Sequence, residues 1–402
     1  MTSDGARPGE GRAAPGGGPP REVPRSGVMP DDGLPAEAFR EGRPAYGTGS
    51  LADLLPSVAA VLGGAGDDRL GLGDELDGVD RVAVLLVDGL GAYQLPLLPG
   101  LSGLPARTLT SGFPSTTPVS LVTLGTGQPP GQHGVLGFTA RMPDGRILNH
   151  IRWNDDPPPA EWQPRPTVFE SAGVPSTQVT RPEFEGTGLT VAAGRGAAFV
   201  GASTLEETAA GMLGALRAGP GIVYGYHPDL DKAGHESGVG SSAWTAAARD
   251  VERLVGILTD GLPPRSALLV TADHGQLNVP GNERIDISAL PGLAAVAGEP
   301  RVRYLHVVPG ALDDVRAAAT ALFGSSAAVL TRFQAISLDL FGPVTRDNLE
   351  RIGDLVIICT GRTVALASAY EPPAVGRLVA YHGSVTAAEL TIPLLSFVRG
   401  SD

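Results

Sequence analysis

Acidic and imidazole side chains follow three apolar runs of the sequence, and one further histidine stands near the end of the chain. They are Asp88, Asp231, His235, Asp273, His274 and His382. Carboxylates and imidazoles are the side chains that bind zinc and similar divalent ions. Taken singly, each aspartate could be a turn former or a helix cap. Together the residues are all metal-ligand types, and we interpret them as a metal centre.

The spacing within two of these groups favours a shared ion. Asp231 and His235 are four residues apart, and Gly234 between them would let the backbone turn both side chains towards one point. Asp273 and His274 are adjacent, which requires a tight turn, because neighbouring side chains on a regular strand face apart. The remaining histidines are interpreted as surface or hydrogen-bonded side chains: His133, His150, His227 and His306.

Thr117 lies in a hydroxyl-rich segment directly before Pro118. This pair is typical of a helix N-cap followed by the first helical residue, and we expect Val119–Leu124 to form the helix. Free N–H groups at a helix N-terminus attract phosphate, although the hydroxyls of residues 115–117 could simply cap the helix. A threonine hydroxyl becomes a useful nucleophile when a metal binds its oxygen. The metal-ligand set therefore makes Thr117 a candidate nucleophile.

Alternating strands and helices must position these groups. Three runs that are apolar on both faces predict strands buried in a parallel sheet, and they are Arg81–Val87, Ile222–Tyr226 and Ala267–Ala272. Apolar residues at three- and four-residue steps predict helices over Thr204–Arg217 and Ser241–Leu262. This pattern predicts an α/β fold with a doubly wound, mostly parallel sheet flanked by helices, whose site lies at the carboxyl ends of the strands. Residues 283–365 are expected to form a small inserted or capping subdomain.

The first part of the chain differs from the rest in composition. Residues 1–45 are rich in Gly and Pro and contain few large apolar side chains. Such a segment cannot bury enough surface to offset the entropy of ordering, so we expect it to be disordered. Residues 46–402 are expected to form the catalytic domain. The chain as a whole is 42% hydrophobic and 18% charged, which is ordinary for a globular enzyme.

Charge and cysteine content limit the classes of function and location. A formal net charge of −13 argues against a protein that coats nucleic acid, because phosphate backbones are bound through clustered Lys and Arg. Bound metal ions would supply the positive charge that an anionic substrate needs. The single cysteine, Cys359, cannot form an internal disulfide. We find no signal peptide and no apolar run long enough for a membrane span, and we expect a cytoplasmic protein.

The order of the motifs resembles that of the alkaline phosphatase superfamily, and most closely its nucleotide pyrophosphatase/phosphodiesterase branch. Phe113–Thr117 matches the Phe-Pro-x-x-Thr motif of that branch, and Thr126–Gly127 matches a Thr-Gly pair that follows it. The match covers residues 80–400, with five separated motifs in the same order. It implies an alkaline-phosphatase-like fold, and it implies that Thr117, rather than Thr116, is the nucleophile.

By the same resemblance the ligands divide between two ions, which are usually zinc in this branch. One ion would be held by Asp88, Asp273, His274 and the Thr117 oxygen, and the other by Asp231, His235 and His382. The implied reaction is hydrolysis of a phosphodiester or nucleotide pyrophosphate bond. The substrate would be a small-molecule phosphate ester or nucleotide, and the intermediate a phosphothreonine.

One position departs from the branch and leaves the substrate class open. Relatives often have an Asn that holds a phosphate oxygen where this chain has Phe138, which cannot donate that hydrogen bond. A phosphomonoesterase, phosphonate hydrolase or phosphomutase on the same fold is an alternative, for which Arg141 or Arg152 would supply positive charge. A non-catalytic, metal-stabilised binding domain is a further alternative.

Elements that select the substrate are expected in residues 138–165 and 280–365. The aromatic side chains that would stack on a base or fill a core are Trp153, Trp162, Phe184 and Tyr304.

Overall fold

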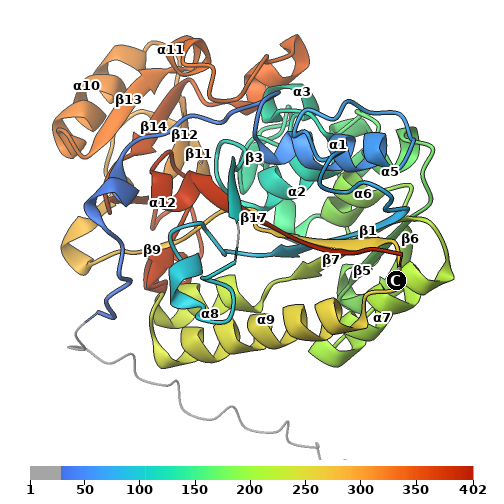
Figure 1. Ribbon diagram of the computed structural model, residues 1–402. Coiled ribbons are helices and arrows are strands. Elements are labelled where there is room, and N and C mark those ends of the chain that lie inside the picture. The colour runs from blue at the N-terminus through green and yellow to red at the C-terminus, as the bar shows by residue number, and fades with distance from the viewer. Residues whose placement is uncertain (1–28, 105, 402) are drawn as a thin grey trace, which may run out of the picture.

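The computed structural model describes residues 29–104 and 106–401. Its centre is a seven-stranded sheet in the order β2-β17-β8-β1-β7-β5-β6 (Figure 1). The strands are β1 (Arg81–Val87), β2 (Ala106–Thr110), β5 (Ser176–Thr180), β6 (Ala198–Gly201), β7 (Gly221–His227), β8 (Ser266–Thr271) and β17 (Thr391–Arg399). Only β17 runs against its neighbours, β2 and β8, so the sheet is mostly parallel. This confirms the predicted α/β sheet.

The register of the central strands brings their carboxyl ends to one edge of the sheet. Val87 at the end of β1 lies opposite His227, the last residue of β7, and Leu86 lies opposite Thr271, the last residue of β8. Strand β8 is buried along its whole length, as expected for a strand covered on both faces. The polar residues that follow these strands therefore emerge side by side.

Helices cover both faces of the sheet (Figure 1). Helices α7 (Leu205–Ala218) and α9 (Ser242–Gly261) lie on one face, and α1 (Leu54–Val61), α2 (Thr117–Thr126) and α6 (Gly188–Gly194) lie on the other. The two long helices begin one residue after the predicted starts, because Thr204 and Ser241 are their N-caps and accept hydrogen bonds from first-turn N–H groups. Shorter helices are α3 (Pro130–His133), α4 (Pro159–Trp162), α5 (Val168–Ser171), α8 (Asp229–Ser237) and α12 (Ala387–Leu390).

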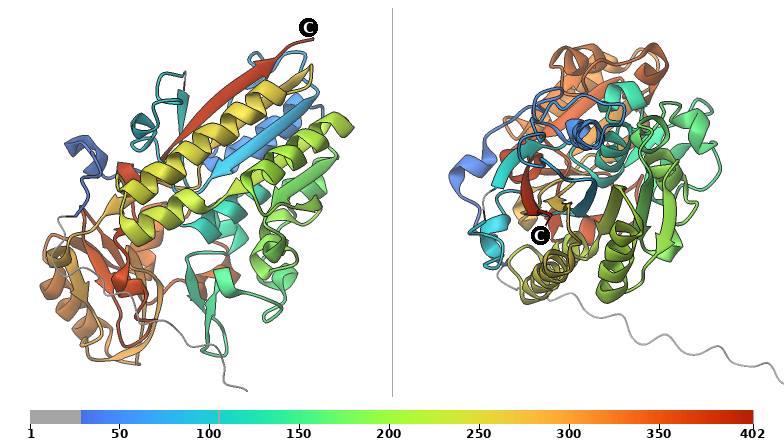
Figure 2. Two further views of the ribbon diagram at one scale, coloured as in Figure 1. Left: turned by 90° about the horizontal axis from the view of Figure 1, so that it is seen from below. Right: turned by 45° about the vertical axis from the view of Figure 1, so that its right-hand side comes forward.

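A second, antiparallel sheet lies within the range 283–365 that was expected to form a capping subdomain. We call it the cap sheet, and it contains β11 (Leu293–Glu299), β12 (Val302–Val307), β13 (Ala327–Thr331) and β14 (Leu355–Cys359), with helices α10 (Leu312–Phe323) and α11 (Arg332–Ser337). It lies beyond the carboxyl ends of the parallel strands, at the opposite end of the molecule from the chain's C-terminus (Figure 2). Two-stranded pairs are β3 (Thr139–Arg141) with β4 (Ile147–Asn149), β9 (Leu277–Asn278) with β16 (Ala380–Tyr381), and β10 (Arg284–Asp286) with β15 (Val364–Leu366).

Residues 1–45 were expected to be disordered, and the structure describes this segment from residue 29 onward. Residues 1–28 lie outside the described residues. The structure corrects the expectation for residues 29–45, which pack against the body of the protein. Asp32 is buried and accepts hydrogen bonds from the Arg362 guanidinium, at 2.8 Å for one pair, and from the Asn278 backbone N–H at 3.0 Å. Composition alone missed this anchor because its partners lie far along the chain.

None of the described helices has the length and apolar character needed to cross a membrane.

Candidate functional site

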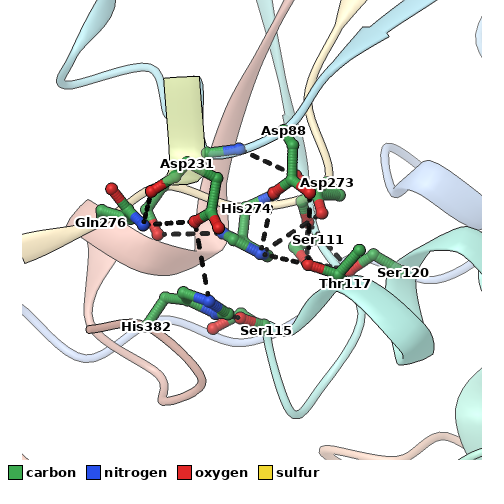
Figure 3. A network of polar contacts seen from close by, with 12 residues as sticks. Asp88, Ser111, Ser115, Thr117, Ser120, Asp231, Asp273, His274, Gln276 and His382 are labelled. Carbon is green, nitrogen blue, oxygen red and sulfur yellow. Dashed lines mark hydrogen bonds and ion pairs between the residues drawn. The ribbon is translucent and has the colours of Figure 1, made fainter. Parts of the chain in front are cut away.

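The first cluster of candidate ligands lies at the ends of β1 and β8 and contains Asp88, Asp273 and His274 (Figure 3). The His274 Nε2 atom is 3.5 Å from Asp88 Oδ1 and 3.3 Å from Asp273 Oδ2. Strand β8 ends at Thr271, so Asp273 and His274 lie beyond it and point to one place, as the sequence requires. The Gly89 N–H donates to Asp273 Oδ1 at 3.0 Å, which fixes that carboxylate. All three side chains are buried.

The second cluster contains Asp231, His235 and His382. The His235 Nε2 atom is 3.2 Å from Asp231 Oδ2 and 3.2 Å from His382 Nε2. Asp231 and His235 lie on the continuous helix α8, where a four-residue spacing puts two side chains on the same face. The expected turn at Gly234 is therefore wrong, because helix geometry alone aligns the two ligands. His382 follows β16 and belongs to the last part of the chain.

The spacing and burial of these groups fit divalent ions. Two ligand atoms of tetrahedral zinc, each about 2.0 Å from the metal, lie roughly 3.3 Å apart. The separations of 3.3 Å and 3.5 Å from His274 Nε2, and of 3.2 Å from His235 Nε2, are close to this value. Asp88 Oδ1 and Asp273 Oδ2 are buried and have no hydrogen-bond partner among the described residues. Burial, with Asp273 and Asp231 nearby, raises the pKa of Asp88 well above its ordinary value. Bound cations would offset this concentration of negative charge.

Hydrogen bonds orient the three imidazoles. The Nδ1 atoms of His235, His382 and His274 lie 2.8 Å, 3.0 Å and 3.3 Å from the carbonyl oxygens of Ala380, Ser115 and Gly275, respectively. An Nδ1–H that donates to a carbonyl leaves the Nε2 lone pair free for a metal. Burial lowers the pKa of His274 to about 4, and burial with His274 alongside lowers the pKa of His382 well below its ordinary value. Both rings are therefore neutral at pH 7, as metal binding requires.

Thr117 lies next to the first cluster. Its Oγ1 atom is 3.2 Å from His274 Nε2 and 3.5 Å from Asp88 Oδ2. The hydroxyls of Ser111 and Ser120 donate to the Asp273 carbonyl at 2.5 Å and 2.9 Å, which ties the start of α2 to the end of β8. The structure therefore brings together every candidate residue that the sequence indicates.

The predicted N-cap of α2 is wrong by one residue, and the helix begins two residues before the expected Val119. Thr116 is the N-cap, with extended backbone angles, and Thr117 is the first helical residue. Pro118 follows as the second, where its missing N–H is still not needed by the helix. Thr117 therefore contributes its hydroxyl to the site and not to a cap, because its backbone is already helical. The helix also continues beyond the expected Leu124 to Thr126.

Two polar contacts of the ligands were not anticipated from the sequence. The Tyr226 hydroxyl, near the end of β7, donates to Asp88 Oδ2, and the Gln276 amide, two residues after His274, donates to Asp231 Oδ1. Tyr226 could have been suspected because it lies at the carboxyl end of a predicted strand. Nothing in the sequence indicated a role for Gln276, because a glutamine in a loop has no characteristic spacing.

A cavity of about 150 Å³ opens beside Thr117. Its lining includes Leu121, Phe184, Leu189 and Tyr226, and no charged side chain of the described residues lines it. Most of the lining comes from residues 178–193 and from β7, whereas we expected substrate selection in residues 138–165 and 280–365. Of those two ranges only Ile151 reaches the cavity.

The other aromatic residues and histidines that the sequence singled out are buried. Trp153, Trp162 and Tyr304 fill cores, and Phe184 is the aromatic side chain of that group that lines the cavity. His133, His150, His227 and His306 are all buried, so none is a surface histidine. His133 is hydrogen bonded to Thr123, and His150 to Gly137, which agrees with a structural role for both.

Comparison with known proteins gives one family and several similar folds. The family model described as type I phosphodiesterase / nucleotide pyrophosphatase matches residues 82–384. An inactive variant of murine ectonucleotide pyrophosphatase / phosphodiesterase 5 in complex with AMP is similar to the chain, with a TM-score of 0.64 and 16% identity over 80% of this chain and 88% of that one.

Phosphonoacetate hydrolase from Sinorhizobium meliloti 1021, in complex with phosphonoformate, has a TM-score of 0.60 and 20% identity over 80% of this chain and 90% of that one. At such identities these structures show a common fold. No curated protein sequence gives a significant match.

Proposed function

Because the chain belongs to the type I phosphodiesterase / nucleotide pyrophosphatase family of the alkaline phosphatase superfamily, we propose that it hydrolyses phosphodiester or nucleotide pyrophosphate bonds through a phosphothreonine on Thr117. The observation that carries the proposal is the position of the Thr117 hydroxyl, 3.2 Å from His274 Nε2 at the first turn of α2. A nucleophile needs an activating group and a place for the phosphoryl oxygens, and this position supports both.

The proposed site holds two zinc ions. Asp88, Asp273, His274 and the Thr117 oxygen would hold one ion, and Asp231, His235 and His382 the other. When bound, the ions would activate the Thr117 oxygen and offset the charge of the phosphoryl group.

The reaction then has two displacements at phosphorus. The Thr117 oxygen attacks phosphorus, the bond to the alcohol or phosphate leaving group breaks, and the hydroxyl proton passes to that group. Water then attacks the phosphothreonine, which still carries the second organic group, restores the Thr117 hydroxyl and releases a phosphate monoester. Each displacement inverts the configuration, so the overall result is retention. The Phe138 side chain donates no hydrogen bond, and we assign the phosphoryl oxygens to free N–H groups at the start of α2.

The cavity beside Thr117 favours a phosphate diester as the substrate rather than a phosphate monoester. A diester or pyrophosphate substrate carries an organic group on the phosphate, and the uncharged lining that includes Phe184 and Tyr226 suits a neutral group of this kind. A phosphate monoester dianion, or a phosphonate with a carboxylate, would need further cations. Neither Arg141 nor Arg152 lines the cavity.

Two measurements on the purified protein test the proposal. Metal analysis is expected to find two zinc ions per chain. Turnover of bis(p-nitrophenyl) phosphate is expected to exceed turnover of p-nitrophenyl phosphate at equal concentration. A preference for the monoester would replace this function with a phosphomonoesterase, and bound metal without turnover of either substrate would favour a non-catalytic binding domain.

A further inference from the structure

Gln276 contacts the second cluster from outside it. Its side chain is fully buried, and its Nε2 atom donates both to Asp231 Oδ1 and, at 3.1 Å, to the Asp231 backbone carbonyl (Figure 3). Both partners are oxygen acceptors, so the amide nitrogen, and not the amide oxygen, must face Asp231. One side chain thus holds the carboxylate and the backbone of the same candidate ligand.

The surrounding chain is shaped to keep this amide in place. A Cβ atom at Gly234 on helix α8 would lie 1.8 Å from Gln276 Oε1, so no larger residue fits there while Gln276 keeps its position. The Gln94 amide donates to the Gln276 backbone carbonyl at 2.6 Å, which fixes the main chain from which this side chain extends. Gly234 therefore provides the space for Gln276 between the two cluster ligands of α8.

We propose that Gln276 is a positioning residue that restricts Asp231 to a single metal-binding oxygen. The inference rests on the proposed function, because it assumes that Asp231, His235 and His382 bind an ion. With Oδ1 occupied by the amide, Oδ2 remains, and this is the oxygen that lies 3.2 Å from His235 Nε2. The cluster then offers three protein atoms, which leaves the fourth position of a tetrahedral ion open for the reacting oxygen.

Loss of the Gln276 donor is expected to weaken metal binding at this cluster. Asp231 could then rotate, bind through both oxygens or turn away, and the pre-set geometry would be lost. Removing the outer hydrogen-bond partner of a ligand typically weakens metal affinity by about 10- to 100-fold.

The test measures zinc binding to the metal-stripped protein by competition with a chromophoric chelator, with no substrate present. Gln276→Leu removes the amide donor. Gly234→Ala adds a Cβ atom that pushes against Gln276 Oε1 and displaces the same amide. Both variants are expected to bind one of the two zinc equivalents about 10-fold or more less tightly than the wild-type protein, and the other equivalent with unchanged affinity. The double variant is expected to lose little more than either single variant, because both substitutions remove one contact.

Gln163→Leu is the matched control. Gln163 is also a fully buried glutamine whose amide donates to a backbone carbonyl, that of Ala192 at 2.7 Å, but it contacts no cluster residue. This control is expected to lose stability without losing zinc affinity. Wild-type affinity in both Gln276→Leu and Gly234→Ala would overturn the positioning role alone. A wild-type protein that binds no zinc would overturn the metal centre of the proposed function as well, so the two failures are distinguishable.

Discussion

Contacts to the ends of β1 and β8 position the Thr117 side chain. Ser111 and Ser120 fix the start of α2 to the Asp273 carbonyl, and His274 contacts the Thr117 hydroxyl directly. In the proposed site the hydroxyl would add one oxygen to a cluster with three other candidate ligands, so metal binding would not depend on it alone. Removing the hydroxyl therefore separates the reaction from the binding of metal.

Thr117→Ala is expected to lower kcat for bis(p-nitrophenyl) phosphate by about 10³-fold or more, as is typical when a nucleophile is removed. Zinc content should stay near that of the wild-type protein, because the carboxylate and imidazole ligands remain. Thr117→Ser keeps a hydroxyl and should retain measurable turnover. Steady-state kinetics and metal analysis on the three proteins test this, and wild-type kcat in Thr117→Ala would exclude the phosphothreonine.

Short elements beside α2 depend on a buried neutral histidine. His150 follows β4, its Nδ1 lies 2.8 Å from the Gly137 carbonyl, and its Nε2 accepts from the Trp162 indole at 3.1 Å. A protonated ring would lose the bond from Trp162, because both nitrogens would then be donors. Burial lowers the pKa of His150 from 6.5 to about 4. The β3–β4 pair and α4 are thus joined by a side chain that must stay uncharged.

This link predicts a loss of stability in acid. The pKa of His150 is lower in the folded state, so the unfolded state binds more protons, and the stabilising contribution is lost as pH falls from about 6.5 towards 4. Between pH 7 and pH 5 the wild-type protein is expected to lose about 2 kcal/mol more unfolding free energy than His150→Gln, whose amide offers a donor and an acceptor but does not titrate. Urea denaturation at both pH values tests this, and parallel losses would contradict it.

At the scale of the whole molecule, segments that are far apart in the chain surround the site. The cap sheet reaches it through Glu299, which accepts from the Phe138 N–H at 3.1 Å, and through Arg301, whose guanidinium pairs with Glu389 in a fully buried contact. Glu389 in turn accepts from the Ser384 N–H, two residues after His382. Polar contacts therefore join the cap to the Phe138 segment and to the segment that follows His382.

Removal of metal is therefore expected to destabilise the whole protein. Buried carboxylates such as Asp88 repel one another when no cation is present. Zinc at a thousandfold excess over its Kd would stabilise the folded state by about 4 kcal/mol per site. Thermal melts followed by circular dichroism should show a lower Tm in EDTA that returns when zinc is added. An unchanged Tm in EDTA would mean that the two clusters bind no metal.

The sequence by itself determined the central strands, the two long helices and the identity of the clustered residues. These features follow from local patterns, because a strand buried on both faces must be apolar and its polar successors must emerge at one edge of the sheet. The cluster at Asp231 and His235 was also readable from spacing. The predicted turn at Gly234 was wrong, because the continuous helix α8 aligns the two side chains.

The tertiary structure alone decided the contacts between residues far apart in the chain. The partners of Asp231 and Asp88, namely Gln276 and Tyr226, depend on which segments pack together, and so does the cavity beside Thr117. The ordering of residues 29–45 by Arg362 is of the same kind. Such contacts leave no periodic trace in a sequence, because their geometry is set by the packing of the whole fold and not by neighbouring residues.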